Sequence, residues 1–192
     1  RQVWSEQQAR RFTIFIFISM LAYSMQDLIL EPYAGIVFGL TPGESTKLAG
    51  TQNGGVFLGM LLVALAANPR FGFGSLRGWT VAGCLGSAAA LIALVSAARG
   101  TDVLPLKMAV FALGFANGAY AVAAIGSMMG LASSGLSGRE GMRMGIWGAS
   151  QALAFGAGGF LGTVAVDVLG RVVETNFTAY ALVFLTEAAL FV

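Results

Sequence analysis

The stretch that decides the fold is Phe12–Leu40, which reads FTIFIFISMLAYSMQDLILEPYAGIVFGL. It is almost wholly apolar and exceeds the ~20 residues that a helix needs to cross the hydrocarbon core of a bilayer. Two carboxylates and a proline, Asp27, Glu31 and Pro32, nevertheless lie inside it. A charged side chain at membrane depth costs at least about 3 kcal/mol, so such residues are rare and are functional candidates by default. The stretch therefore predicts a membrane helix that carries an acidic site.

The composition of the whole chain agrees with a membrane protein. Hydrophobic residues make up 57% and charged residues 10%, whereas soluble domains carry about 25% charged residues. The net charge of +2 gives no reason to expect a nucleic-acid partner. The sequence contains no histidine, the commonest metal ligand and proton shuttle. Phosphate-loop and nucleophile-elbow motifs are also absent from it, so we expect neither an enzyme nor a protein metal centre.

Apolar runs along the chain predict an all-α, polytopic protein with six transmembrane helices. The runs cover residues 12–40, 47–67, 79–98, 105–132, 143–167 and 177–192. The last run is short for a span, so we expect the natural chain to continue past Val192. Six spans are half of a major-facilitator protein, in which each half contains 3+3 inverted repeats. We predict the C-terminal half of such a fold, with residues 12–192 as the bundle and an N-terminal six-helix half as its partner.

Polar residues 1–11 precede the first span and suit the end of a cytoplasmic linker between the two halves. With Arg11 placed in the cytoplasm, the positive-inside rule compares basic residues on the two sides. The cytoplasmic set is then the larger one: Arg1, Arg10, Arg11, Arg70, Arg77, Arg139 and Arg143 against Lys47, Arg99, Lys107 and Arg171. We therefore expect the N-terminal end to be cytoplasmic.

Glycines spaced by four residues recur along the predicted spans. Such spacing lets membrane helices approach closely, and an inverted repeat predicts that the glycine-dense second and fifth spans correspond. An alternative role is a surface on which other membrane helices or flat pigment rings dock. The helix-packing candidates in those two spans are Gly50, Gly54, Gly55, Gly59, Gly158 and Gly162, and other spans carry pairs such as Gly114/Gly118.

The acidic site centres on Asp27 and Glu31, which share one helix face at a spacing of four residues. Gln26 and Tyr23 are further candidates for pigment or proton binding, and Pro32 is expected to weaken the helix one turn back. Three interpretations stay open for the two acids. They hydrogen-bond to Gln52, Asn53 or Gln151 on neighbouring spans and fix the bundle, they provide an oxygen ligand to a magnesium ion, or they take part in proton-coupled transport.

Other polar and aromatic residues inside spans form a second group of candidates. Each polar one could line a cleft between the two halves or hydrogen-bond between helices: Gln52, Asn53, Asn117, Tyr120 and Gln151. Glu187 is isolated in the last span, and we expect it to face a partner chain or the cytoplasmic interface. Five aromatic residues are candidate ring-packing surfaces: Phe12, Phe15, Phe17, Trp79 and Trp147.

The motif Gln26-Asp27-x-x-x-Glu31-Pro32-Tyr33-x-Gly35, followed by Phe38-Gly39-Leu40-Thr41-Pro42-Gly43-Glu44-Ser45-Thr46-x-Leu48, resembles the PucC/LhaA family. That family is a bacteriochlorophyll-linked branch of the major facilitator superfamily. The resemblance implies an assembly factor for bacterial light-harvesting and reaction-centre complexes in the photosynthetic inner membrane. Its implied partners are antenna polypeptides, the reaction-centre complex and the lipid bilayer. Bacteriochlorophyll is a possible cofactor, and its magnesium is then the ion that Asp27 and Glu31 would ligate.

The turn after the second span, residues 68–78, is where facilitators carry a signature with an aspartate between glycine and arginine. Here Arg70 and Arg77 persist and the aspartate is missing. This departure counts against an active transporter and fits a facilitator fold that serves as a scaffold. Two alternatives to an assembly factor stay open: a proton-coupled transporter of a tetrapyrrole or small solute, and a permanent structural subunit of a photosynthetic complex.

Overall fold

The computed structural model describes residues 6–67, 72–98, 100, 103–133 and 140–192, and these residues are helical apart from short turns. The helices are α2 (Gln7–Phe38), α3 (Pro42–Ala66), α4 (Leu76–Ala97), α5 (Val103–Ser133), α6 (Glu140–Leu169) and α7 (Asn176–Phe191). Helices α2 to α6 are long and apolar enough to cross a membrane, and α7 is a shorter apolar helix of 16 residues. The prediction of an all-α, multi-pass membrane protein is confirmed.

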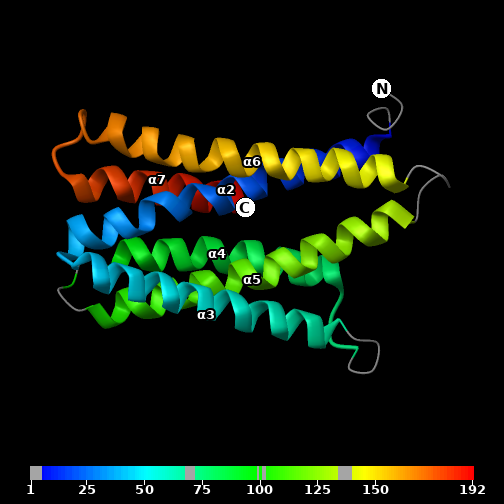
Figure 1. Cartoon of the computed structure of the whole chain (residues 1–192), viewed down its shortest axis with the longest axis horizontal. Coiled ribbons are helices and arrows are strands. Elements are labelled where there is room, and N and C mark those ends of the chain that lie inside the picture. The colour runs from blue at the N-terminus through cyan, green and yellow to red at the C-terminus, as the bar shows by residue number, and fades with distance from the viewer. Residues whose placement is uncertain (1–5, 68–71, 99, 101–102, 134–139) are drawn as a thin grey trace.

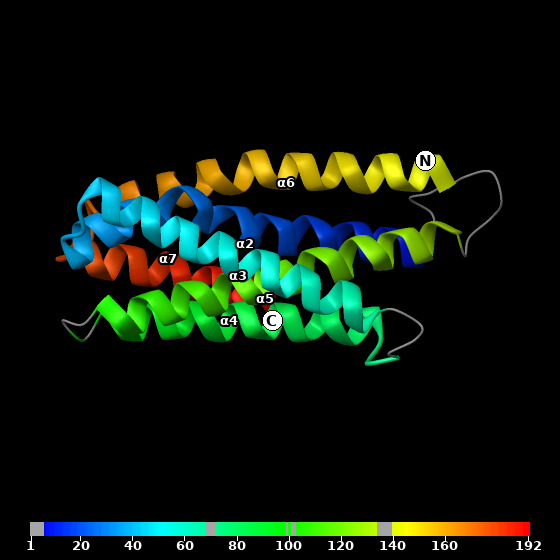
Figure 2. The same cartoon turned by 60° about the horizontal axis from the view of Figure 1, so that its bottom comes forward.

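The six helices lie roughly along one axis and alternate in direction, so α2, α4 and α6 begin at the same end of the bundle (Figures 1 and 2). Helix packing defines two groups, α2 with α6 and α7, and α5 with α3 and α4, and α7 also packs on α4 across the two groups. The most extensive helix packing is α3 on α5, α4 on α5 and α2 on α6. Large buried side chains between the helices include Tyr33, Tyr120, Trp147 and Phe184.

Helix α2 differs from its predicted span at its start and in its middle. It begins at Gln7 and runs through Pro32 without a break, although Pro32 contributes no backbone N–H. The residues just before Phe12 therefore form the first turns of the helix; residues 1–5 lie outside the described part, and an inter-half linker stays a prediction. Gly39, with φ of 68°, ends the helix in the left-handed conformation that glycine adopts without strain.

Helix α3 begins at Pro42, five residues before the predicted apolar run, because its first turn is a polar capping motif. The Glu44 carboxylate accepts hydrogen bonds from the Thr41 backbone N (2.9 Å) and the Thr41 hydroxyl (2.8 Å). Pro42 occupies the first helical turn, where a missing N–H removes no helical hydrogen bond. Hydropathy detects the apolar part of a helix, so it misses a polar first turn of this kind.

The α3–α5 and α2–α6 crossings both contain glycines spaced by four residues at the helix contact. A Cβ added to Gly55 or Gly59 of α3 would collide with the Phe111 and Phe115 carbonyl oxygens of α5, respectively. In α6, a Cβ on Gly158 would lie 2.7 Å from the Leu21 carbonyl oxygen of α2, and one on Gly162 would lie 2.5 Å from the Met25 carbonyl oxygen. Both crossings thus bring the backbones into contact, with Gly55, Gly59, Gly158 and Gly162 at the contacts between helices.

The helix-packing prediction is wrong for Gly50 and Gly54. Both lie on an exposed face of α3, and a Cβ on either would meet none of the described residues within 4 Å. They fall on a different side of the helix from Gly55 and Gly59, so the spacing of four residues alone does not identify the packed face. Gly114 and Gly118 of α5 do pack, because a Cβ there would collide with the Gln52 and Val56 carbonyl oxygens.

Side-chain hydrogen bonds join the two groups of helices inside the bundle. The hydroxyls of Ser19 on α2 and Tyr120 on α5 hydrogen-bond to each other, and both side chains are buried. The Tyr33 hydroxyl of α2 donates to the Leu94 carbonyl of α4 at 3.0 Å. In a bilayer each such bond contributes on average about 0.6 kcal/mol. These few polar contacts, in addition to helix packing, fix how far the two groups of helices are shifted relative to each other along the bundle axis.

Candidate functional site

The acidic strip, which we define as Asp27 and Glu31, lies on the outer surface of α2. Both residues are exposed, and the described part of the chain gives neither carboxylate a hydrogen-bond or ion-pair partner. Their shared face agrees with the four-residue spacing. The expected hydrogen bonds from these acids to Gln52, Asn53 or Gln151 are not formed among the described residues, so the strip does not tie these six helices together.

The strip lies well inside the membrane-spanning length of α2. Asp27 is eleven residues before Phe38, the last residue of the helix, which at 1.5 Å per residue is about 16 Å along the axis. Apolar side chains border the acids on the same surface: Leu28 and Ile36 are 57% and 55% exposed, and Pro32 is exposed as well. An exposed carboxylate at this depth requires water or a polar or cationic partner to face it.

Behind the strip, two polar side chains are buried. Gln26 of α2 and Glu187 of α7 each have 0% exposure, and no hydrogen bond from another described residue reaches the Gln26 amide or the Glu187 carboxylate. Glu187 lies within electrostatic reach of Asp27, and it follows the first residue of α7 by eleven positions. It therefore lies at about the depth of Asp27, since both helices have an end at the same side of the bundle (Figure 1).

This placement corrects the expectation for Glu187, which faces the bundle interior and neither a partner chain nor an interface. Sequence reasoning missed it as a neighbour of the acidic site because 160 positions of chain separate it from Asp27. Gln26 was included among the site candidates, yet its side chain lies on the buried side of α2, away from the exposed acids. Tyr23 is half-buried and packs edge-on against Phe155 of α6, with ring centroids 5.6 Å apart.

The proposed cleft-lining residues separate into two sets. Asn117 and Tyr120 are 1% and 0% exposed inside the bundle, where Asn117 Oδ1 accepts a hydrogen bond from the Ser87 hydroxyl at 2.7 Å. These two residues form interhelical hydrogen bonds and reach no open surface. Asn53 is exposed on α3 and Gln52 is half-buried there. Gln151 is half-buried on α6, where its amide nitrogen lies 3.8 Å from the Met20 sulfur.

The aromatic candidates also divide. Trp147 is 1% exposed and its indole N–H donates to the Thr13 hydroxyl at 3.1 Å, so the expectation of a surface residue is wrong for it. Trp79 is half-buried and its indole N–H donates to the Phe73 carbonyl at 2.9 Å. Phe15 is 37% exposed, and Phe12 and Phe17 are half-buried.

Several residues used for the orientation argument fall outside the described part of the chain, namely Arg1, Arg70, Arg99 and Arg139. Residues 68–71 of the turn after the second span lie outside it as well. Among the other arginines, Arg143 is 4% exposed and forms an ion pair with Glu6 at 2.5 Å. The side of the membrane on which the N-terminal end lies stays a prediction.

Comparisons with known proteins point to one family. A family described as PUCC protein matches the chain over residues 1–192. The chain is 57% identical to the "Bacteriochlorophyll synthase 44.5 kDa chain" of Rhodobacter capsulatus, an alignment that covers 100% of this chain and 44% of the relative. It is 31% identical to "Protein PucC" of Cereibacter sphaeroides, covering 98% of this chain and 40% of that protein. The chain thus spans less than half the length of these relatives. No solved structure matches it.

Proposed function

Because this chain belongs to the PucC family, we propose that it is the membrane-embedded C-terminal half of an assembly factor for bacterial light-harvesting and reaction-centre complexes. In this role the protein helps to insert antenna polypeptides or to deliver bacteriochlorophyll in the photosynthetic inner membrane. The observation that carries the proposal is the exposed acidic strip of Asp27 and Glu31 at membrane depth. Carboxylates in this position need a partner outside the six helices.

The facilitator fold is part of the same proposal, and the helix packing supports it. An inverted repeat that pairs α2 with α5, α3 with α6 and α4 with α7 makes the α3–α5 crossing equivalent to the α6–α2 crossing. Both crossings place glycines four residues apart against carbonyl oxygens four residues apart. Under this pairing the packing of α2 with α6 and α7 corresponds to the packing of α5 with α3 and α4, although α2 packs less extensively on α7 than α5 does on α4. The N-terminal half of the full-length protein would then be one occupant of the exposed faces.

Bacteriochlorophyll ligation is the more specific form of the proposal. The residues present fit an oxygen ligand to magnesium, because the oxygens of Asp27 and Glu31 have no partner among the described residues. The exposed apolar surface of Leu28, Pro32 and Ile36 lies beside them and could contact a flat macrocycle. The pigment, when bound, supplies light absorption, and the role of this chain is to hold and orient it.

The name of the Rhodobacter capsulatus relative contains the word synthase, and that word applies to the relative and not to this chain. For this chain we propose a non-catalytic role, because the acidic strip is bordered by apolar side chains and, within the described residues, adjoins no nucleophile paired with a base. An acidic strip with apolar borders can bind and position a ligand.

A proton-coupled transporter is the second candidate, and Glu187 is the observation that favours it. The Glu187 carboxyl is fully buried, has no hydrogen bond among the described residues and lies near the exposed Asp27 carboxylate of α2. Buried acids of this kind relay protons through membrane transporters. This function predicts pH-dependent solute uptake into proteoliposomes, lost in Glu187→Gln. A protein that moves no solute at any pH contradicts it.

The test of the assembly role uses the full-length protein purified in mild detergent from phototrophically grown cells. Absorbance spectra and mass spectrometry of one chromatographic peak are expected to show bacteriochlorophyll and antenna polypeptides together. Asp27→Asn/Glu31→Gln is expected to lose most of the pigment while it elutes as a folded protein. The matched control is Asp167→Asn/Glu174→Gln, which neutralises two exposed acids beyond the strip.

Each outcome of this experiment separates the candidates. A colourless wild-type protein without antenna polypeptides would contradict the assembly role. Pigment retained in full by the acidic-strip variant would contradict ligation by these acids and leave antenna binding as the role to map. Stoichiometric presence in the mature complex would instead support a permanent structural subunit.

A further inference from the structure

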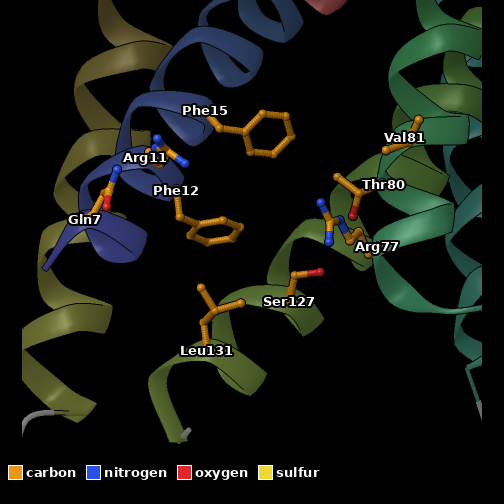
Figure 3. Close-up of a pocket in the computed structure, with 9 residues that line it drawn as sticks. All are labelled: Gln7, Arg11, Phe12, Phe15, Arg77, Thr80, Val81, Ser127 and Leu131. Carbon is orange, nitrogen blue, oxygen red and sulfur yellow. The ribbon is translucent and has the colours of Figure 1, made fainter. Parts of the chain in front are cut away.

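A cavity of about 670 Å³ opens between α2, α4 and α5 at the end of the bundle where α2 and α4 begin. Figure 3 shows the aromatic rings of Phe12 and Phe15 projecting from α2 toward Arg77 and Thr80 of α4. Ser127 and Leu131 of α5 form another wall (Figure 3). This cavity lies far along α2 from the acidic strip and is separate from the site described above.

Two arginines, Arg11 and Arg77, line the cavity and carry its charge. Neither forms an ion pair within the described residues, where the carboxylate of Glu6 is engaged by Arg143 at 2.5 Å. The hydroxyls of Thr80 and Ser127 donate to carbonyls of their own helices at 2.9 and 2.8 Å. The Arg11 and Arg77 guanidinium groups, together with the Gln7 amide, are therefore the donors of the cavity wall that remain available to an anion.

The lining changes from cationic to apolar with depth. Arg11 lies near the start of α2 and Phe15 one turn further into the helix; Arg77 lies near the start of α4 and Val81 one turn further in. At the ends of spanning helices this direction leads from the headgroup region toward the hydrocarbon. The cavity thus offers positive charge at its rim and aromatic surface below it.

We propose that this cavity binds an anionic phospholipid, with its phosphate held by Arg11 and Arg77 and an acyl chain along Phe12 and Phe15. Guanidinium groups bind phosphate oxygens through charge-assisted hydrogen bonds, and basic pockets between membrane helices at the headgroup level recognise anionic lipids. A free anion would engage the rim and leave the aromatic wall uncovered. A neutral lipid would cover the wall and leave two cations without a counter-charge.

The test follows thermal unfolding of the full-length protein, delipidated in a neutral detergent, as lipid is added. Phosphatidylglycerol is expected to raise the unfolding midpoint, whereas phosphatidylcholine and inorganic phosphate are expected to leave it near its starting value. Arg11→Gln/Arg77→Gln should weaken the apparent affinity for phosphatidylglycerol by about tenfold or more. Lys107→Gln/Arg171→Gln is the charge-matched control at the other end of the bundle.

A second variant separates acyl-chain contact from charge. Phe15→Ser keeps both arginines, and we expect it to weaken phosphatidylglycerol binding. Because the Phe15 ring also packs on Phe12 and Tyr120, the shift caused by the lipid is measured from the variant's own lipid-free midpoint. Equal stabilisation by phosphatidylcholine, or by inorganic phosphate alone, would overturn the proposal. Unchanged phosphatidylglycerol binding in the double arginine variant would overturn it as well. None of these outcomes depends on pigment or antenna binding, so the assembly role is tested separately.

Discussion

The α3–α5 and α2–α6 crossings share a glycine spacing but differ in the helix that receives the glycines. On α5 the receiving surface also contains glycine, because Gly114 and Gly118 lie directly against α3 carbonyl oxygens. On α2 the corresponding surface contains Ser24, whose hydroxyl lies 3.1 Å from the Ala154 carbonyl oxygen of α6. One crossing is therefore backbone against backbone, and the other includes a polar side chain.

This difference coincides with where the candidate site lies. Helix α2 carries Ser24, Gln26, Asp27 and Glu31 within two turns, whereas α5 carries Asn117 and Tyr120 with their hydrogen bonds satisfied inside the bundle. We infer that α5 mainly holds the bundle together, whereas α2 also places polar side chains on an exposed surface, where they do not contribute to helix packing. Such exchange of stability for function is common at functional sites.

The largest effect is expected from crowding the glycine crossing of α5. Gly114→Ala/Gly118→Ala forces backbone shifts, and overpacking of this kind costs about 1–3 kcal/mol per site. The unfolding free energy of the full-length protein in detergent should fall accordingly, as measured by denaturant titration of its circular dichroism. Gly158→Ala/Gly162→Ala should cost less, because the carbonyl oxygens that the added methyl groups meet, at 2.7 and 2.5 Å, are farther away than those at Gly114 and Gly118, and the Ser24 side chain can rotate.

The control for this comparison is Gly50→Ala/Gly54→Ala, where added methyl groups meet open space. Since alanine favours helix by about 1 kcal/mol over glycine, that variant should be as stable as the wild type or more stable. Equal losses at all three pairs would show that the distinction between packed and open glycines is wrong.

A smaller change of opposite sign is expected at Glu187. Glu187→Leu removes a buried carboxyl that has no hydrogen bond in the described structure, and an unsatisfied buried polar group costs about 1–3 kcal/mol. The unfolding free energy should therefore rise by an amount in that range. Glu187→Gln retains a polar group and should show a smaller gain. Destabilisation by leucine would instead mean that the full-length protein provides a partner for this carboxyl.

The smallest effect is expected from the link between the two groups of helices. Tyr120→Phe removes the hydroxyl that meets Ser19, while the Ser19 hydroxyl keeps its bond to the Phe15 carbonyl at 2.6 Å. The cost should be about 0.6 kcal/mol, the average for hydrogen bonds between membrane helices. Tyr180→Phe is the control, because no hydrogen bond of the Tyr180 hydroxyl is seen among the described residues. A loss no larger than in this control would mean that helix packing alone holds α2 and α5 together.

The sequence by itself determined the number and order of the helices, because a bilayer requires long apolar segments whose backbone groups are satisfied within the helix. It also identified Asp27 and Glu31 as site candidates, since charged residues are rare inside an apolar segment of spanning length. Their common face followed from the helical repeat.

Only the tertiary structure decided which residues meet. Gly54 and Gly55 are neighbours in sequence, yet one faces open space and the other a carbonyl of α5, because the position of a neighbouring helix selects the packed face. Glu187 joins the surroundings of Asp27, and Arg11 and Arg77 line one cavity, only because α7 and α4 pack beside α2 and α5. Hydropathy depends on single residues, whereas these juxtapositions depend on the crossing of helices that are distant in the chain.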